Sequence, residues 1–102
     1  MHQCGWVLIA FQNAFYQLLH SESVEQAIVE TVNVGGDTDT NGAICGALMG
    51  AVYGIGSIPE RWQNTILNCR ASKDNPDCKH PRPSCFWADC VLELAERLLK
   101  MT

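Results

Sequence analysis

The residues best suited to chemistry lie in one short loop near the middle of the chain, Gly35-Gly36-Asp37-Thr38-Asp39-Thr40-Asn41-Gly42. The glycine pair allows a sharp turn, so two carboxylates and a hydroxyl come together on one bend. Oxygen donors of this kind suit Mg²⁺, Mn²⁺ or Ca²⁺ better than zinc, which prefers nitrogen and sulfur. We therefore expect Asp37, Asp39 and Thr40 to ligate a divalent metal.

The loop also allows other interpretations. Asp and Thr are good helix N-caps, although one Asp would be enough for capping. The start of an EF-hand loop is matched, but the twelfth residue, counting Asp37 as the first, is Leu48, where that loop needs a bidentate Glu. A phosphate-binding P-loop would need a Gly-Lys-Ser/Thr ending, which does not follow. An acid/base pair of carboxylates stays open as an alternative.

The elements that must position this loop are predicted to be helices. Apolar residues recur at helical spacing between residues 6 and 19, which indicates a buried face made of Val7, Leu8, Phe11, Ala14, Phe15, Leu18 and Leu19. A second helix is predicted from the N-cap Ser23, with Gln26 completing a capping box, to Val34, where Gly35-Gly36 ends it. Its predicted inner stripe is Val24, Ala27, Ile28 and Val32.

A third helix is predicted to start within the loop and to run to about Tyr53. Glycines recur every four residues along it, at Gly42, Gly46, Gly50 and Gly54. This spacing places them on one face, where another backbone could approach closely. Each interior glycine costs about 1 kcal/mol relative to alanine, so tight packing is expected to compensate. A membrane-dimer role is disfavoured because the stretch is short.

Two more helices are predicted after a start signal in which Ser57 caps, Pro59 occupies the first turn and Glu60 completes the box. Ile58, Trp62, Ile66 and Leu67 are expected to pack inward. Residues 70–83 are predicted to be a loop, and Ser84 to open a last helix with a buried stripe of Phe86, Cys90, Val91, Leu94 and Leu98. Strand-like alternation is lacking, so residues 1–102 are predicted to be one all-α domain of about five helices.

Composition excludes some classes of function. Apolar residues form 47% of the 102 residues, and the formal net charge is −4. An acidic chain without basic runs disfavours nucleic-acid and membrane partners. No targeting segment is recognised, so we expect a cytoplasmic protein with reduced cysteines. Zinc binding by Cys69, Cys78, His80, Cys85 and Cys90, or a disulfide among the cysteines, is a weaker alternative because no Cys-x-x-Cys pair is present.

The glycine-framed Asp-Thr-Asp-Thr loop, together with Ile58-Pro59-Glu60-Arg61-Trp62, closely resembles the C-terminal region of the ADP-ribosylglycohydrolase family. The resemblance spans about residues 5–67 and leaves out the Cys- and Pro-rich loop and terminal helix of residues 70–102. It implies an irregular all-α bundle in which Asp37, Asp39 and Thr40 ligate Mg²⁺, or Mn²⁺ in some members. It also implies cleavage of the glycosidic bond between ADP-ribose and a protein.

The same resemblance implies an incomplete site. Family members are much longer, and their N-terminal part supplies a Thr-Asp-Asp stretch and a Glu to the metals, whereas no Thr-Asp-Asp occurs here. We therefore expect a hydrolase-like domain that is inactive alone. It is either a fragment or a relative that has lost catalysis. A third possibility is that identical chains assemble and complete one another's sites. ADP-ribose or an ADP-ribosylated protein is the implied ligand. The alternative is a non-catalytic helical module, and a homo-oligomer is expected because of the glycine face and the aromatic residues Trp6, Phe11, Phe15 and Trp62.

Overall fold

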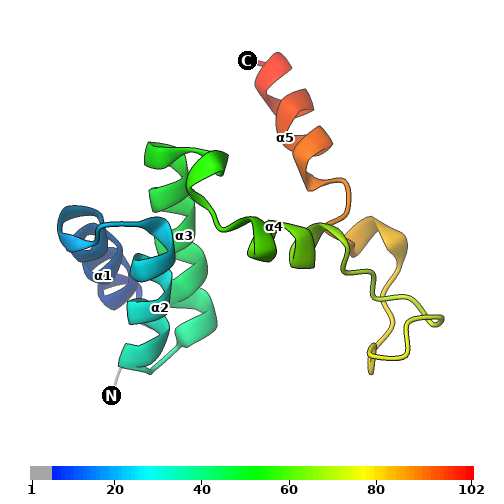
Figure 1. Cartoon of the computed structure of the whole chain (residues 1–102), viewed down its shortest axis with the longest axis horizontal. Helices are drawn as coiled ribbons and strands as arrows, with labels where there is room; N and C mark the ends of the chain where they lie inside the picture. The colour runs from blue at the N-terminus through cyan, green and yellow to red at the C-terminus, as the bar shows by residue number, and fades with distance from the viewer. Residues whose placement is uncertain (1–5) are drawn as a thin grey trace. The chain divides into compact units, whose positions relative to one another are not determined.

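The computed structural model describes residues 6–102, and within that range it is helical with no strand (Figure 1). This confirms the predicted all-α class and the number of α-helices. Two short 3-10 helices accompany them, one before α4 and one before α5. The α-helices are Val7–His20 (α1), Val24–Val34 (α2), Thr38–Tyr53 (α3), Glu60–Leu67 (α4) and Val91–Lys100 (α5).

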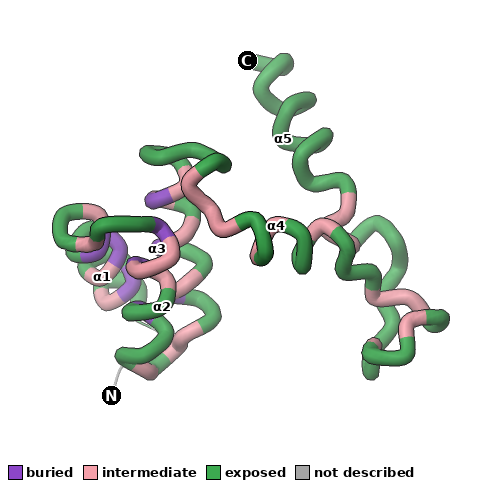
Figure 2. The backbone as a smooth tube through the Cα atoms, in the orientation of Figure 1, coloured by how far each residue is buried: buried purple, intermediate pink, exposed green. Residues whose placement is uncertain are grey.

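The chain divides into two compact units, one ending at Pro59 and one from Glu60 to Thr102. In the first unit, α3 packs against both α1 and α2. Every buried residue of the described chain lies in these three helices, as the purple segments in Figure 2 show. The buried apolar side chains are small on average and consist of Ala10, Ala14, Val24, Ala27, Cys45 and Met49. Cys45 thus behaves as the small buried hydrophobe that its helical pattern indicated.

The buried face of α1 differs from the predicted one. Ala10, Ala14 and Gln17 are buried, whereas most of the predicted apolar stripe is exposed, including Phe11 and Leu19. Apolar residues occupy a broad arc of this helix, so periodicity alone could not tell which part of the arc meets α3. The side of α1 that carries Ala10 and Ala14 is the buried one, because small side chains allow the axes of two packed helices to come close.

The boundaries of α2 agree with the prediction, and so does the cap. The Ser23 hydroxyl accepts from the backbone N–H of Gln26 at 3.1 Å. The Gln26 side chain reaches back to the N–H of Glu22, one residue before the expected partner of a capping box. The prediction of Val32 as an inner residue was wrong, because Val32 is 46% exposed and its neighbour Thr31 is 2% exposed.

Helix α3 begins and ends where predicted, but its glycine face does not receive another backbone. A Cβ added at Gly42 or Gly46 would meet only side-chain atoms of α2, and one at Gly50 would meet nothing within 4 Å. The buried line of α3 lies one residue to the side of the glycines, at Asn41, Cys45 and Met49. The side chains of this line, rather than the glycines, form the contact with the core.

The start of α4 was predicted too early. Ser57 lies in the 3-10 helix Ile55–Ser57, and its hydroxyl donates to the carbonyl of Gly54. The α-helix begins only at Glu60. Gly54, which follows α3, has a φ of 80° and turns the chain before α4 begins. Ile58 packs on the core of the first unit, as expected, whereas Ile66 is 53% exposed.

In the second unit, residues 70–83 form the predicted loop, but the last helix starts at Val91 rather than Ser84. Ser84–Phe86 instead forms a 3-10 turn, and Trp87 then takes an extended conformation that interrupts the helix. The predicted stripe is exposed throughout, at Phe86, Cys90, Val91, Leu94 and Leu98. The second unit therefore buries no residue of its own, and its apolar helix face is open.

None of the helices within residues 6–102 combines the length and the apolar character needed to cross a bilayer.

Candidate metal centre

The predicted metal loop connects α2 to α3, and its glycines are required by its shape. Gly35 and Gly36 have φ values of 86° and 79°, a region that residues with a side chain rarely adopt. The turn is closed by a bond of 3.0 Å from the N–H of Thr38 to the carbonyl of Gly36. Asp37 follows as the N-cap residue of α3, and its carbonyl accepts from the N–H of Asn41 at 2.9 Å.

The two acidic side chains of the loop lie one residue apart, and the pKa of Asp39 is lowered from its ordinary value. A hydrogen bond with the Asp37 side chain is the largest cause that lowers the pKa of Asp39. The backbone N–H groups of Thr40 and of Asp39 itself add smaller contributions in the same direction, the former to Asp39 Oδ1 at 2.9 Å. The lowered pKa favours the ionised carboxylate of Asp39.

A capping role does not account for Asp37. Its side chain makes no capping hydrogen bond to the start of α3. Asp39 and Thr40 lie in the first helical turn and are exposed, while Asp37 is half-buried. At the beginning of α3, Asp39 and Thr40 are therefore open to solvent and Asp37 is partly so.

The donor set fits part of the coordination shell of a hard divalent cation. Mg²⁺ prefers oxygen ligands and keeps several waters, so two carboxylates and a hydroxyl are suitable donors. Within residues 6–102, His, Cys, Asp and Glu form no group of three or more that could hold a metal ion. Any further protein ligand would have to come from beyond these residues or from a main-chain or hydroxyl oxygen.

Polar residues that the sequence reasoning missed lie in the core beneath the loop. Asn41 is 5% exposed although it belongs to the loop motif. Thr31 is also buried, and its hydroxyl accepts from Asn13 at 2.9 Å. The signal for such residues was weak, because isolated polar residues at a helix interface look like surface residues in a sequence pattern. The bond between Asn13 and Thr31 joins α1 to α2.

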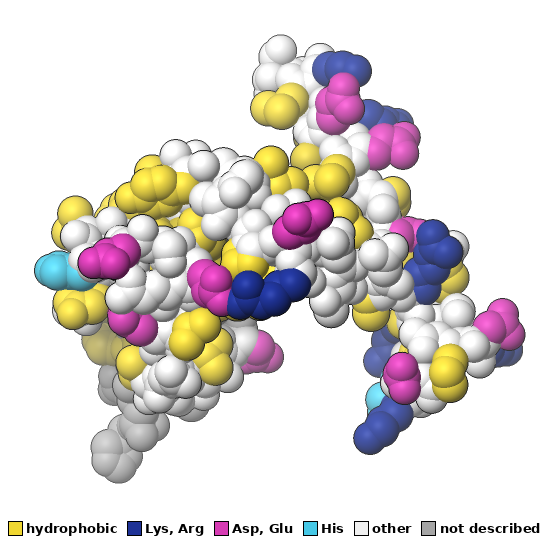
Figure 3. Space-filling model, in the orientation of Figure 1, with side chains coloured by type: hydrophobic (Ala, Val, Ile, Leu, Met, Phe, Trp, Pro, Cys, Tyr) yellow, Lys and Arg dark blue, Asp and Glu magenta, His cyan; other side chains and the backbone are white. Residues whose placement is uncertain are grey.

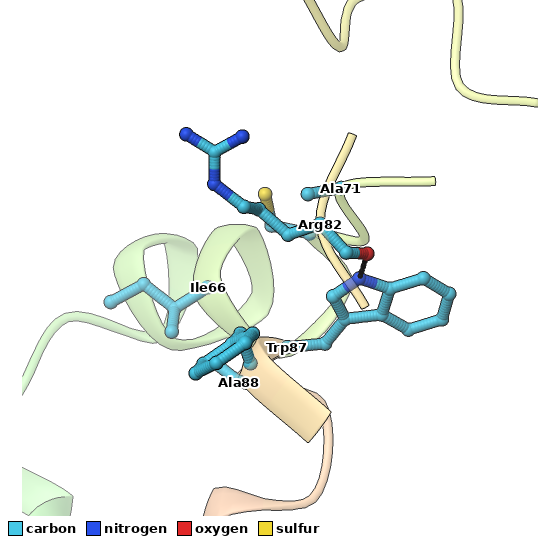
Figure 4. A pocket seen from close by; sticks show the side chains of 7 residues that line it. Ile66, Ala71, Arg82, Trp87 and Ala88 are labelled. Carbon is cyan, nitrogen blue, oxygen red and sulfur yellow. Dashed lines mark hydrogen bonds between the residues drawn. The ribbon is translucent and has the colours of Figure 1, made fainter. Parts of the chain in front are cut away.

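The second unit contains a separate cavity of about 260 Å³, which the sequence did not indicate (Figure 4). Its wall is mostly apolar and is lined by Ile66, Cys69, Ala71, Arg82, Phe86, Trp87 and Ala88. The indole N–H of Trp87 donates to the carbonyl of Arg82 at 3.0 Å, and this bond holds one side of the wall. An ion pair of 3.2 Å between Arg70 and Asp89 braces the same loop.

The described cysteines are free, namely Cys45, Cys69, Cys78, Cys85 and Cys90. Cys4 lies outside the described residues.

The fold and the loop define a class of protein: an all-helical domain with two aspartates, one residue apart, on a glycine turn at the start of a helix. The model of one family, ADP-ribosylglycohydrolase, matches residues 1–102. The chain belongs to the ADP-ribosylglycohydrolase family.

Individual relatives match shorter segments. A protein of Acanthamoeba polyphaga mimivirus, named as an ADP-ribosyl glycohydrolase, is 50% identical over 54 residues, which is 53% of this chain and 16% of the relative. The ADP-ribosyl-[dinitrogen reductase] glycohydrolase of Rhodospirillum rubrum is 35% identical over 62 residues, or 61% of this chain and 21% of the relative. Human ADP-ribosylhydrolase ARH3 is 40% identical over 43 residues, or 42% and 12%. No solved structure matches the chain at comparable significance.

Proposed function

We propose that this chain is an ADP-ribosylglycohydrolase-like domain that binds Mg²⁺, or Mn²⁺, through Asp37, Asp39 and Thr40. It would take part in hydrolysis of ADP-ribosyl glycosidic bonds when another polypeptide completes the site. Membership of the family, and the hydrolase activities for which its relatives from Rhodospirillum rubrum and human are named, support the reaction class. The matched segments cover 21% or less of the three relatives described above, so the activity of a whole relative is a proposal for this chain.

One observation carries the metal part of the proposal: Asp37 and Asp39 stand one residue apart directly after the glycine turn, and Asp37 is half-buried at the start of α3 without capping that helix. A helix N-terminus carries partial positive charge and disfavours a cation. Two carboxylates at that end supply more negative charge than helix capping needs, and Asp37 makes no capping bond. Charge balance at this position therefore favours a bound cation.

The residues have separate parts in the proposed chemistry. A bound Mg²⁺ would polarise a substrate oxygen or a water molecule as a Lewis acid. Asp37 and Asp39 would hold the ion, and the Gly35-Gly36 turn would fix the direction of their side chains. Thr40 would add a neutral oxygen from the next position along the first turn.

Calorimetric titration with Mg²⁺ and Mn²⁺ tests the metal site. The wild-type chain is expected to release or absorb binding heat that Asp37→Ala loses. Asp74→Ala is the matched control, because Asp74 is an exposed carboxylate in the loop of the second unit. Equal heats from the wild type and Asp37→Ala would refute metal binding at this loop.

Hydrolysis of an ADP-ribosylated peptide tests the catalytic part. The chain alone is expected to show no turnover with or without Mg²⁺, because three donors leave most coordination positions to water and nothing holds the sugar. Turnover by the chain alone would show that the site is complete and would contradict the proposal as stated.

A second candidate is a self-associating helical module without catalysis. It is favoured by the large apolar side chains that are exposed on α1 and α5 (Figure 3). Light scattering over a range of concentrations tests it: a homo-oligomer is expected, and a monomer throughout would exclude it. A cytoplasmic location is a further proposal, based on cysteine spacing that does not suggest a disulfide framework.

A further inference from the structure

Helix α1 presents a continuous apolar face to solvent. We call the exposed residues Leu8, Phe11, Phe15 and Leu19 the outer α1 face; their exposed fractions are 52%, 59%, 43% and 76%. The ring centroids of Phe11 and Phe15 lie 4.7 Å apart, so the two rings form one patch. A shallow hollow of about 410 Å³ opens between them and is lined by Leu8, Phe11, Gln12 and Phe15.

In the first unit, small apolar side chains are buried and large ones are exposed, which is the reverse of the usual arrangement in an isolated domain. Three of its six buried apolar residues are alanines, whereas its phenylalanines are outside. Phe and Leu are normally among the most buried residues. The sequence of α1 also contains no Asp, Glu, Lys or Arg. A helix that is apolar on most of its circumference is typically covered on more than one side.

The lengths of the relatives indicate what covers this face. In the three relatives, the matched segment makes up 12–21% of the protein, so more than three quarters of each chain lies outside it. A small unit with so few buried side chains cannot supply a full core by itself. The remainder of the family fold is a polypeptide of sufficient size to provide the missing layer. The absence of charge on α1 fits an apolar partner surface of this kind rather than an ionic one.

We infer that the outer α1 face is the docking surface for the part of the ADP-ribosylglycohydrolase fold that lies outside the matched segment. This inference rests on the proposed function only through family membership, because docking does not require metal or catalysis. Docking would place α1 between α3 on one side and the remaining fold on the other.

The test uses the full chain, produced together with the Rhodospirillum rubrum glycohydrolase from which the 62 matched residues are deleted. Hydroxyl-radical footprinting with mass spectrometry then reports the oxidation of each aromatic side chain. Phe11 and Phe15 are expected to be oxidised severalfold more slowly in the complex than in the chain alone. Tyr53, which is 53% exposed at the end of α3, is the internal reference.

A substitution pair separates docking from folding. Phe11→Ser with Phe15→Ser is expected to weaken the complex at least about 30-fold, the effect of losing buried aromatic anchors. Val29→Ser is the control, because Val29 on α2 is 43% exposed, as is Phe15. Circular dichroism checks that each variant keeps the helix content of the wild type.

Several results would overturn the inference. One is unchanged oxidation of Phe11 and Phe15 in the complex, and another is weakening of the complex by Val29→Ser as large as that by the double phenylalanine variant. A third is protection that depends only on the concentration of the chain, because it would indicate a second copy as the partner. If the deleted relative does not stay soluble, the matched segment is replaced by this chain in one polypeptide, and the same protection of Phe11 and Phe15 is required there. Calorimetry with Mg²⁺ on the chain alone distinguishes failure of docking from failure of the metal site.

Discussion

Asn13 donates a hydrogen bond of 2.9 Å from Nδ2 to the hydroxyl of Thr31, and this bond joins α1 to α2. The Thr31 hydroxyl in turn donates to the carbonyl of Ala27 at 2.7 Å. Both the proton and an acceptor site of this hydroxyl are therefore used, at a position that is 2% exposed. A buried polar link of this kind constrains how the two helices pack.

Replacing Thr31 with Val should test this link. The shape is kept, but Asn13 loses its acceptor in a partly buried position, so the free energy of unfolding is expected to fall by about 1–3 kcal/mol. Urea unfolding followed by circular dichroism measures the change. Thr65→Val is the control, because Thr65 donates to the carbonyl four residues earlier in the same way but is exposed. A change in Thr31→Val no larger than in the control would show that the link contributes little.

The core of the first unit should be sensitive at Met49, which is fully buried. Met49→Ala is expected to lower stability by about 2–5 kcal/mol through lost burial and a cavity. Val52→Ala, three residues away and 54% exposed, is expected to stay within about 0.5 kcal/mol of wild type. Thermal unfolding of both variants compares them. Similar midpoints would indicate that the Met49 contacts are not those of the folded chain.

Gly50 of α3 gives a prediction of increased stability, in contrast to the two destabilising substitutions above. A methyl group at Gly50 would meet nothing within 4 Å. Gly50→Ala is therefore expected to raise the free energy of unfolding by about 0.5–1 kcal/mol, because alanine restricts the unfolded chain. The measurement is urea unfolding at a concentration where the chain is monomeric. Destabilisation would mean that another backbone packs against this face, as the glycine spacing originally suggested.

The acidic loop should make stability depend on pH. The pKa of Asp39 is lowered in the folded state, first by the Asp37 side chain and then by backbone N–H groups. Its contribution is therefore fully present above the ordinary aspartate pKa and is lost as pH falls through the lower, folded value. The loss of stability in acid should be smaller in Asp39→Asn than in the wild type. Unfolding measured over a series of acidic pH values would contradict this if both proteins lost stability in parallel.

The positions of the first three helices could be predicted closely because their end signals are local. Ser23 caps α2, the glycines after Val34 end it, and Gly54 ends α3, each by backbone preferences that do not depend on distant contacts. The acidic loop could be located as well, because Asp37 and Asp39 stand one residue apart directly after the glycine pair. Whether they hold a metal stays a prediction.

Other features could not be predicted from periodicity. The wide apolar arc of α1 allowed several inner faces, and the start of α5 depends on Trp87, whose indole is held by the carbonyl of Arg82. Phe86 and Leu98 were expected to be buried but are exposed. The pattern of an amphipathic helix shows which face is apolar, but it does not show that another part of the same chain covers that face.

By itself, the sequence determined the helical class, the ends of α2 and α3 and the glycine-framed acidic loop, because caps, turns and periodicity act over a few residues. Only the tertiary structure decided which side of α1 is buried, that Thr31 rather than Val32 faces inward, and that the aromatic rings stay outside. These outcomes depend on how closely α3 approaches its neighbours, and that distance is set by side chains from separate helices acting together.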